Sequence, residues 1–343
     1  MSHVIDASTA GPRRPARVLT NMRGLLASSD GPQWIAWPAP AEGPAERRRI
    51  IRRSFSYDYV FWDTLDRDFL MLALLKRLVP FYRPRLVLLN LLVMAPVSRA
   101  QRAKFRLMAW LLRGTHKIVQ YHRDTRALQE HLRLPAHRFD YLPFKINQRE
   151  LVERTVPTDG GYIFCGGKTR RDFDTFIAAV SALPYPVKIV TTSNDDIAEH
   201  GSYLADRPLP PHIEIVRVDG SAGPFIELLA GARLVVQPIK PDICGVGIGV
   251  YILAMALQKC VVMTAGPTTN QDLTEDQAMI VPPQDAAALR EAIRRAYTDD
   301  ALRLRLAENG HKLATEMGGE ERLFARIGAW LQRDWQGAPQ AVR

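Results

Sequence analysis

The sequence predicts a two-domain α/β protein whose second half is a doubly wound parallel sheet. From residue 162 onward short apolar segments alternate with helical segments, a pattern typical of parallel sheets. The 343 residues suffice for two domains of ordinary size. Residues 1–150 carry 26 basic and 12 acidic residues, a net charge of +14, whereas residues 151–343 carry 20 and 24, a net charge of −4. This difference indicates two domains that face different partners.

The first domain is expected at residues 17–147. Residues 1–16 are small, polar and proline-rich and should be disordered, and the proline-rich stretch 34–44 should be a loop. Residues 148–160 have the composition of a linker. The expected elements are a strand at 17–26, a strand at 57–62, a helix at 65–78, a strand at 85–93, a helix at 98–113, a strand at 117–121, a helix at 124–132 and a closing segment at 139–144.

Two arginine-rich segments carry much of the positive charge of the first domain. Five arginines lie within residues 47–53, and four more share one stripe of the helix expected at 98–113, within residues 99–113. Both segments can be solvated helix faces, or they can bind an anionic membrane surface or acceptor. No zinc-finger or RNP-like motif accompanies them, so nucleic acid is not an expected partner.

The second domain is expected at residues 161–318, followed at 319–343 by a C-terminal helix that crosses back to the first domain. Its regular alternation of strands and helices gives the elements directly. The strands are expected at 162–165, 187–191, 213–218, 234–239, 260–264 and 278–281, and the helices at 173–183, 195–199, 224–232, from 248 onward, 285–297, 301–317 and 321–335.

Two glycine-rich turns in the second domain are suited to a phosphate group. Gly245, Gly247 and Gly249 separate a buried strand from a helix that begins near Ile248, so backbone N–H groups and the helix N-terminus can approach an anion. A Gly-Gly pair at 166–167 follows another strand and precedes three basic residues. Ligands bind at the carboxyl ends of strands in such sheets, so the turns predict a nucleoside-diphosphate site. The Gly-Gly-Lys run lacks the spacing of a P-loop, which argues against an ATPase.

The cysteines and the apolar segments bear on location. Cys165, Cys244 and Cys260 are far apart and form no C-x-x-C pair, which favours a reducing cytoplasm. The N-terminus lacks an uninterrupted apolar segment of signal-peptide type. The longest apolar run, at 86–96, is shorter than the roughly 20 residues that span a bilayer. We therefore expect a cytoplasmic protein that is not integral to the membrane.

Four motifs in order resemble the GT-B glycosyltransferases of the "glycosyl transferases group 1" family. They are FDYLPFKIN (139–147), YIFCGGKTRRDFDTFIAAV (162–180), GVGIGVYILAMALQKCVVMT (245–264) and DLTEDQAMIVPPQDAAALREAI (272–293). The resemblance covers about residues 139–310 and implies two Rossmann-like domains that face a cleft. It also implies transfer of a sugar from a UDP- or GDP-linked donor to a glycan or lipid-linked acceptor, in polysaccharide or glycoconjugate biosynthesis. Such an enzyme would be cytoplasmic or peripheral on the cytoplasmic membrane face and would need no metal.

One departure from the family affects the sugar and ribose part of the expected site. Group 1 enzymes usually carry two glutamates, E-x7-E, the first near the donor sugar and the second at the ribose hydroxyls. Alignment of LAMA (253–256) with the family's EAMA places Leu253 at the second and Gly245 at the first. A leucine accepts no hydrogen bond from a ribose. Either Asp242 replaces the first glutamate in a divergent enzyme, or the chain is an inactive GT-B-like scaffold that partners an active transferase.

The resemblance assigns roles to individual residues. Candidates for catalysis are Asp63, at the end of a strand, and His122 and Asp124, after another strand, because an inverting enzyme needs a base that deprotonates the acceptor hydroxyl. The donor sugar and nucleoside are expected at Asp242, Asn194, Asp219 and Thr268. The residues expected at the diphosphate are Gly166, Gly167, Lys168, Arg171, Gly245, Val246, Gly247 and Ile248.

Overall fold

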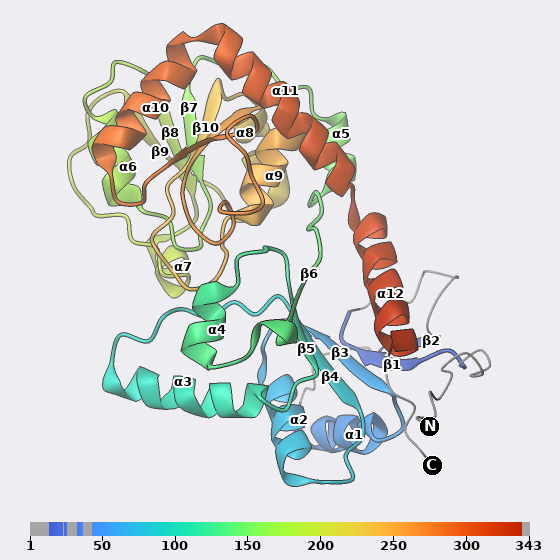
Figure 1. Ribbon diagram of the computed structural model, residues 1–343. Helices are drawn as coiled ribbons and strands as arrows, with labels where there is room; N and C mark the ends of the chain where they lie inside the picture. The colour runs from blue at the N-terminus through green and yellow to red at the C-terminus, as the bar shows by residue number, and fades with distance from the viewer. Residues whose placement is uncertain (1–13, 23, 26–32, 37–42, 338–343) are drawn as a thin grey trace, which may run out of the picture. The chain divides into compact units, whose positions relative to one another are not determined.

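The computed structural model describes residues 14–22, 24–25, 33–36 and 43–337 (Figure 1). Most of the stretch 1–16, for which we expect disorder, lies outside these ranges. The chain divides into two compact units. Unit 1 comprises residues 1–90, 107–118 and 324–343, and unit 2 comprises residues 91–106 and 119–323. The domain ranges expected from the sequence stay predictions.

The first sheet has six strands in the order β2-β1-β3-β4-β5-β6. Its strands are β1 (Arg17–Thr20), β2 (Gln33–Ala36), β3 (Tyr59–Asp63), β4 (Arg85–Leu89), β5 (Lys117–Gln120) and β6 (Phe139–Tyr141). The helices of this part of the chain are α1 (Pro44–Ser54), α2 (Arg67–Leu78), α3 (Arg99–Leu112), α4 (Arg126–Leu132) and α5 (Arg149–Arg154). A 3-10 turn, η3, spans Ala136–Arg138.

The structure corrects one expectation for this part of the chain. The stretch 34–44 is not a loop throughout, because β2 pairs in parallel with β1 in the register Arg17↔Gln33. The tryptophan and isoleucine of this strand favour β structure, and the prolines that suggested a loop begin only at residue 38. The stretch 148–160, which has the composition of a linker, includes the six-residue helix α5.

Unit 1 includes most of the C-terminal helix α12 (Glu320–Gly337), from Phe324 onward. Asp334 accepts a hydrogen bond from the Tyr59 hydroxyl (2.5 Å), and His116 Nε2 lies 2.8 Å from the same carboxylate. Burial raises the pKa of Asp334, but the hydrogen bonds from His116 and Tyr59 outweigh it and hold that pKa below its usual value. Because Tyr59 belongs to β3, the carboxylate fastens the helix to the sheet of its own unit.

The sheet of unit 2 is parallel throughout, with the strand order β12-β11-β10-β7-β8-β9. Figure 1 shows helices on both faces of this sheet. Its strands are β7 (Ile163–Gly166), β8 (Val187–Thr191), β9 (Ile213–Arg217), β10 (Leu234–Gln237), β11 (Cys260–Thr264) and β12 (Met279–Val281). Its helices are α6 (Phe173–Val180), α7 (Asn194–Glu199), α8 (Ala222–Ala230), α9 (Ile248–Ala256), α10 (Ala286–Thr298) and α11 (Asp300–Met317).

The strand order of this sheet fixes where a ligand can bind. The chain winds outward from β7 through β8 to β9, and then returns to place β10 on the other side of β7. The connections that follow β7 and β10 therefore leave in opposite directions and open a crevice at the carboxyl ends of these two strands. Both glycine-rich turns of the sequence follow these two strands.

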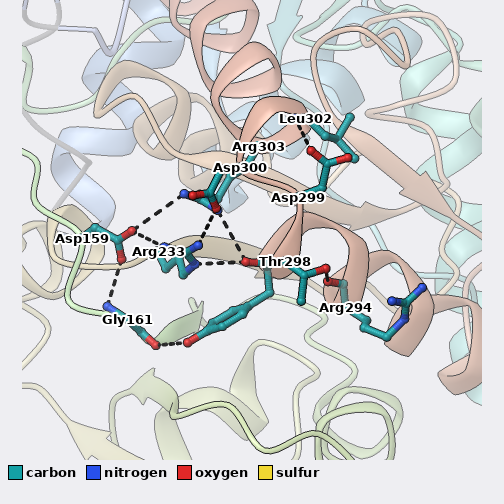
Figure 2. A network of polar contacts seen from close by, with 10 residues as sticks. Asp159, Gly161, Arg233, Arg294, Thr298, Asp299, Asp300, Leu302 and Arg303 are labelled. Carbon is teal, nitrogen blue, oxygen red and sulfur yellow. Dashed lines mark hydrogen bonds and ion pairs between the residues drawn. The ribbon is translucent and has the colours of Figure 1, made fainter.

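A network of polar contacts holds the amino ends of the same two strands (Figure 2). Arg233, which precedes β10, donates to Asp159 (2.5 Å), to Asp300 (2.6 Å) and to the Tyr297 carbonyl (3.1 Å). The Tyr297 hydroxyl donates to the Gly161 carbonyl (2.7 Å), just before β7. One guanidinium thus joins the entry to β7 with the junction of α10 and α11.

We expect Arg233→Leu to lower the free energy of unfolding by about 1–3 kcal/mol, because it removes one part-buried donor from each of two carboxylates and from one carbonyl. Urea denaturation followed by circular dichroism measures the change. Arg294→Leu is the matched control, since Arg294 forms an exposed pair with Glu291 on α10 and should leave the midpoint unchanged. Equal shifts in both variants would contradict a specific role of Arg233.

Candidate functional site

The two glycine-rich turns lie side by side at the crevice of unit 2. Arg171, five residues beyond β7, forms an isolated antiparallel bridge with Ile239, two residues beyond β10. Backbone bonds from Asp172 N to Pro238 O (2.9 Å) and from Lys240 N to Arg170 O (2.9 Å) continue this pairing. The fold therefore brings together the loops that carry Gly166-Gly167 and Gly245-Gly247.

Gly247 begins α9 in a conformation that suits glycine. It is the N-cap residue with φ 88°, and no side chain caps the helix. Beneath it, the buried amide of Gln237 accepts from Tyr251 N (2.7 Å) and donates to Gly247 O (3.2 Å), with the amide orientation assigned from this network. The turn that begins α9 is thus supported by Gln237, and the N-terminus of a helix is suited to an anion.

Arg171 is a buried cation between the two turns. Its side chain is 2% exposed, and Nε donates to Gly166 O (2.8 Å) while Nη1 donates to Thr169 O (3.3 Å). A Cβ at Gly167 would lie 2.5 Å from Nη2, and one at Gly247 would lie 3.4 Å from Nη1, so the guanidinium occupies the space that both glycines leave. Burial lowers the pKa of Arg171 to about 10, so it stays charged at neutral pH.

No carboxylate pairs with Arg171 within the part of the chain that the structure describes. A buried guanidinium that donates only to carbonyl oxygens keeps its full positive charge and has N–H groups to spare. An anion is the partner that such a group lacks. Lys168, in contrast, is half-exposed and its ammonium pairs with Asp196 (2.7 Å).

A cavity of about 180 Å³ lies beside these turns, at the carboxyl ends of β7, β8 and β9. Its size suits one part of a ligand, such as a base with its ribose, because whole small ligands usually need about 300 Å³ or more. Apolar side chains form much of its wall: Val190, Val218, Phe225, Ile226 and Leu253. Polar residues complete the wall: Asn147, Gln148, Lys168, Thr191, Thr192 and Ser221.

Two residues expected at the nucleoside do not line this cavity, although their neighbours do. Asp219 accepts from Ser221 N (2.8 Å) and Ser221 Oγ (2.5 Å), bonds that lower the pKa of Asp219 and shape the turn before α8. Asn194 accepts from Arg217 (2.6 Å) at the start of α7. The assignment of Asp219 and Asn194 to the nucleoside stays a prediction.

Asp242, the expected replacement for the first glutamate, is engaged elsewhere. Its side chain is 1% exposed, and one oxygen lies 2.7 Å from Arg170 Nε. The other oxygen accepts from Ile243 N (2.7 Å) and Ala95 N (3.2 Å). Asp242 therefore organises the loop after β10 and is absent from the cavity wall. Its assignment to the donor sugar stays a prediction.

His122 fills the space beside Gly245. Its Nε2 accepts from Gly245 N (3.1 Å) and its Nδ1 lies 3.0 Å from Asp124 O, so the ring carries its proton on Nδ1. A Cβ at Gly245 would lie 2.4 Å from His122 Cδ2 and 2.6 Å from Thr268 Cγ2. A glutamate therefore cannot replace Gly245 without moving a buried ring. The Thr268 hydroxyl donates to Val246 O (3.2 Å) and braces the same turn.

The three candidates for catalysis have different surroundings. His122 is 1% exposed and both of its nitrogens are engaged, so it can serve as a base only after Gly245 N releases Nε2. Asp124 accepts from Arg126 (2.8 Å) and Asn270 (2.7 Å), and the hydrogen bond from Arg126 holds its pKa well below the usual value. Asp63 lies in unit 1, where its backbone pairs with the Asn21 amide. The catalytic assignments stay predictions.

Two wall residues escaped the sequence analysis. Asn147 and Gln148 line the cavity, although the sequence analysis placed them at the domain junction and assigned them no role. Asn147 ends the FDYLPFKIN motif, so its position in that motif was the one signal that could have found it. Thr191, which also lines the cavity, has its Oγ1 buried without a hydrogen-bond partner among the described residues.

Comparisons with known proteins bear on the fold of the chain. Residues 162–299 match the family model described as "Glycosyl transferases group 1". The fold is similar to sucrose-phosphate synthase from Thermosynechococcus elongatus, with a TM-score of 0.64, 15% identity and coverage of 95% of this chain and 100% of that one. It is also similar to HepE from Anabaena in complex with UDP and glucose, with a TM-score of 0.62, 12% identity and coverage of 93% and 100%.

A glycosyltransferase from Rickettsia africae is a third similar structure, with a TM-score of 0.59, 12% identity and coverage of 95% and 100%. At these identities the likeness establishes the fold, which is GT-B. A search of curated sequences finds no significant match. None of the helices in the described ranges has the length and apolar composition needed to cross a bilayer.

We expect His122 to make the protein less stable in acid. Burial lowers its pKa to about 4 from a usual value near 6.5, so between these pH values the unfolded chain binds a proton that the folded chain does not. The stability that the neutral ring contributes is complete above pH 6.5 and declines by about 3 kcal/mol as the pH falls toward 4. Urea denaturation at pH 5 and pH 7.5 measures it.

The His122→Gln variant is the control, because glutamine does not titrate. Its stability should depend less on pH than that of the wild type over this interval. The same slope in both proteins would show that other groups cause the acid sensitivity.

Proposed function

We propose that the protein transfers a sugar from a nucleoside diphosphate sugar to a glycan or lipid-linked acceptor, because residues 162–299 match the group 1 glycosyltransferase family model and the chain has the GT-B fold. The structures of HepE with UDP and with UDP-glucose support a nucleotide-sugar donor by analogy. The reaction would break the bond between the sugar and the diphosphate and form a glycosidic bond to an acceptor hydroxyl.

The buried Arg171 carries this proposal. Loss of the sugar leaves a diphosphate whose negative charge grows in the transition state, and fixed positive groups in a water-poor site stabilise such charge best. Arg171 has no carboxylate partner in the described ranges, and the uncapped N-terminus of α9 adjoins it across Gly247. The two together offer the charge and the N–H groups that a diphosphate needs, so no metal is expected.

The cavity then suits the nucleoside. Its apolar wall can cover the faces of a base, while its polar residues supply hydrogen bonds to the base edge and the ribose. The base would lie beside the turn that contains Val218 and Gly220, and the sugar would extend toward Gly245 and His122. The alternative, an inactive scaffold, keeps the phosphate site but transfers no sugar.

An anionic membrane surface is the partner that we propose for helix α3. Residues 69–123 contain eleven lysines and arginines and no acidic residue. In and before α3, Arg99, Arg102 and Arg106 are exposed, as are Met94 (51%), Val97 (80%) and Leu107 (60%). Exposed apolar side chains next to unpaired positive charge favour the interface of an anionic bilayer, where a lipid-linked acceptor would be found.

We expect Arg171→Met to weaken the binding of a nucleoside diphosphate about 10- to 100-fold, because a charge-assisted contact of about 1.5–3 kcal/mol is lost. Isothermal titration with UDP, GDP and ADP measures binding. Hydrolysis of the corresponding nucleotide sugars, run in EDTA because no metal is expected, measures turnover. Arg294→Met on α10 removes a positive charge far from the site in sequence and should change neither quantity.

Arg171→Lys separates a binding defect from misfolding, since lysine keeps the charge but not the guanidinium fork. It should bind nucleotide better than Arg171→Met at similar thermal stability. If no nucleotide binds the wild type, the proposed function is wrong. If nucleotide binds but no nucleotide sugar is turned over, the scaffold alternative is favoured.

For the membrane surface, we expect sedimentation with vesicles that contain an anionic phospholipid and little with neutral phosphatidylcholine vesicles. Replacement of Arg102 and Arg106 by glutamine should reduce the bound fraction, and added salt should do the same. The matched control replaces Arg294 and Arg295 on α10. Equal binding to both vesicle types, or equal loss in both double variants, would exclude α3 as the docking helix.

A further inference from the structure

The cavity lacks a carboxylate where group 1 enzymes place one for the ribose. Leu253 occupies that position on α9 and presents an apolar side chain to the cavity wall. A bound nucleotide would leave both ribose hydroxyls without partners there, and unpaired buried hydroxyls are costly. Some other polar group must meet them if the site binds a nucleotide.

The Asn147 side chain lies next to this position. Gly249 precedes Leu253 by one turn of α9, so the two residues share a face of the helix. A side chain at 253 covers the surface over the preceding turn, which is the turn of Gly249. A Cβ at Gly249 would lie 3.1 Å from Asn147 Nδ2, so the amide occupies the space above that turn. Asn147 and Leu253 accordingly appear together in the cavity wall.

The backbone around Asn147 is fixed while its amide is not engaged. Ile146 N donates to Gly318 O (2.7 Å), and Lys145 pairs with Glu320 (2.7 Å). Gln148, the next residue, is the N-cap of α5 in a left-handed conformation (φ 53°). The amide of Asn147 itself makes no hydrogen bond within the described ranges. A rigidly held polar group that faces a cavity without a partner is arranged for a ligand.

We propose that Asn147 binds the ribose hydroxyls of the nucleotide in place of the carboxylate that Leu253 lacks. This inference rests on the proposed function. An amide has one acceptor oxygen and one donor nitrogen, so Oδ1 can accept from one hydroxyl while Nδ2 donates to the other. A vicinal diol matches that pair. Unlike a glutamate, the amide adds no negative charge near the diphosphate.

The experiment compares nucleotides with and without the diol. Isothermal titration is done with UDP, GDP and ADP and with the 2′,3′-dideoxy form of each. For the wild type we expect the ribonucleotide to bind about 5- to 20-fold more tightly than its dideoxy form, as one or two hydrogen bonds allow. Asn147→Ala should reduce this ratio to about 1 and leave the affinity for the dideoxy form unchanged.

Two further variants test the assignment to Asn147. Gln148→Ala removes the neighbouring amide and should keep the wild-type ratio. Leu253→Glu combined with Asn147→Ala supplies the carboxylate at the family position and should restore a ratio well above 1. Recovery in the double variant shows that the site is folded and lacked only a partner for the diol.

The outcomes separate this inference from the proposed function. If the wild type binds no nucleotide, both are wrong. If nucleotide binds and Asn147→Ala keeps the full ratio, the proposed function stands and the role of Asn147 is excluded. If Gln148→Ala alone abolishes the ratio, the diol is bound by Gln148 instead and the inference is overturned.

Discussion

A buried guanidinium sets the arrangement of the candidate site. Arg171 reaches the carbonyl of Gly166 from the loop that follows β7, and its Nη atoms lie against the positions of Gly167 and Gly247. The strand order brings β7 and β10 together, but it does not by itself hold their loops in contact. The bridge between Arg171 and Ile239 does so. Arg171 thus joins the two loops through its backbone, and within the described part of the chain no carboxylate pairs with its guanidinium, so the proposed phosphate site and the local structure depend on the same residue.

The turn after β10 shows why a glycine, Gly245, occupies the position of the family's first glutamate. The N–H of Gly245 donates to His122 Nε2, and the lack of a side chain at Gly245 leaves room for the imidazole. A Cβ at position 245 would lie 2.4 Å from His122 Cδ2. The ring is neutral, because burial lowers its pKa to about 4. Because His122 fills the space beside Gly245, a glutamate at position 245 would also require a smaller side chain at position 122.

The sequence predicted the second domain far better than the site. The strand Cys260–Thr264 was predicted to the residue, because a buried parallel strand is a continuous apolar run that needs no knowledge of its neighbours. The edge strand β2 was missed because it is only four residues long and lies next to a proline-rich stretch that indicated a loop. At the site, Gly166, Gly167 and Gly247 could be placed from local spacing. Asn147 could not, because its contact with Gly249 joins residues a hundred positions apart.

The absence of glutamates at positions 245 and 253 removes hydrogen-bond acceptors for the donor, and it also removes negative charge that would repel a diphosphate. Two charges about 6 Å apart interact by about 3 kcal/mol at an effective dielectric constant of about 20, so a carboxylate beside a diphosphate opposes its binding substantially. With Gly245 and Leu253 uncharged, Arg171 would act on the proposed diphosphate without opposition from carboxylates at these two positions. Neutral groups can make the hydrogen bonds that the two glutamates are expected to make in the family, since an amide both donates and accepts. A site with fewer charges can thus hold the diphosphate firmly and still recognise a ribose, provided that Asn147 faces it.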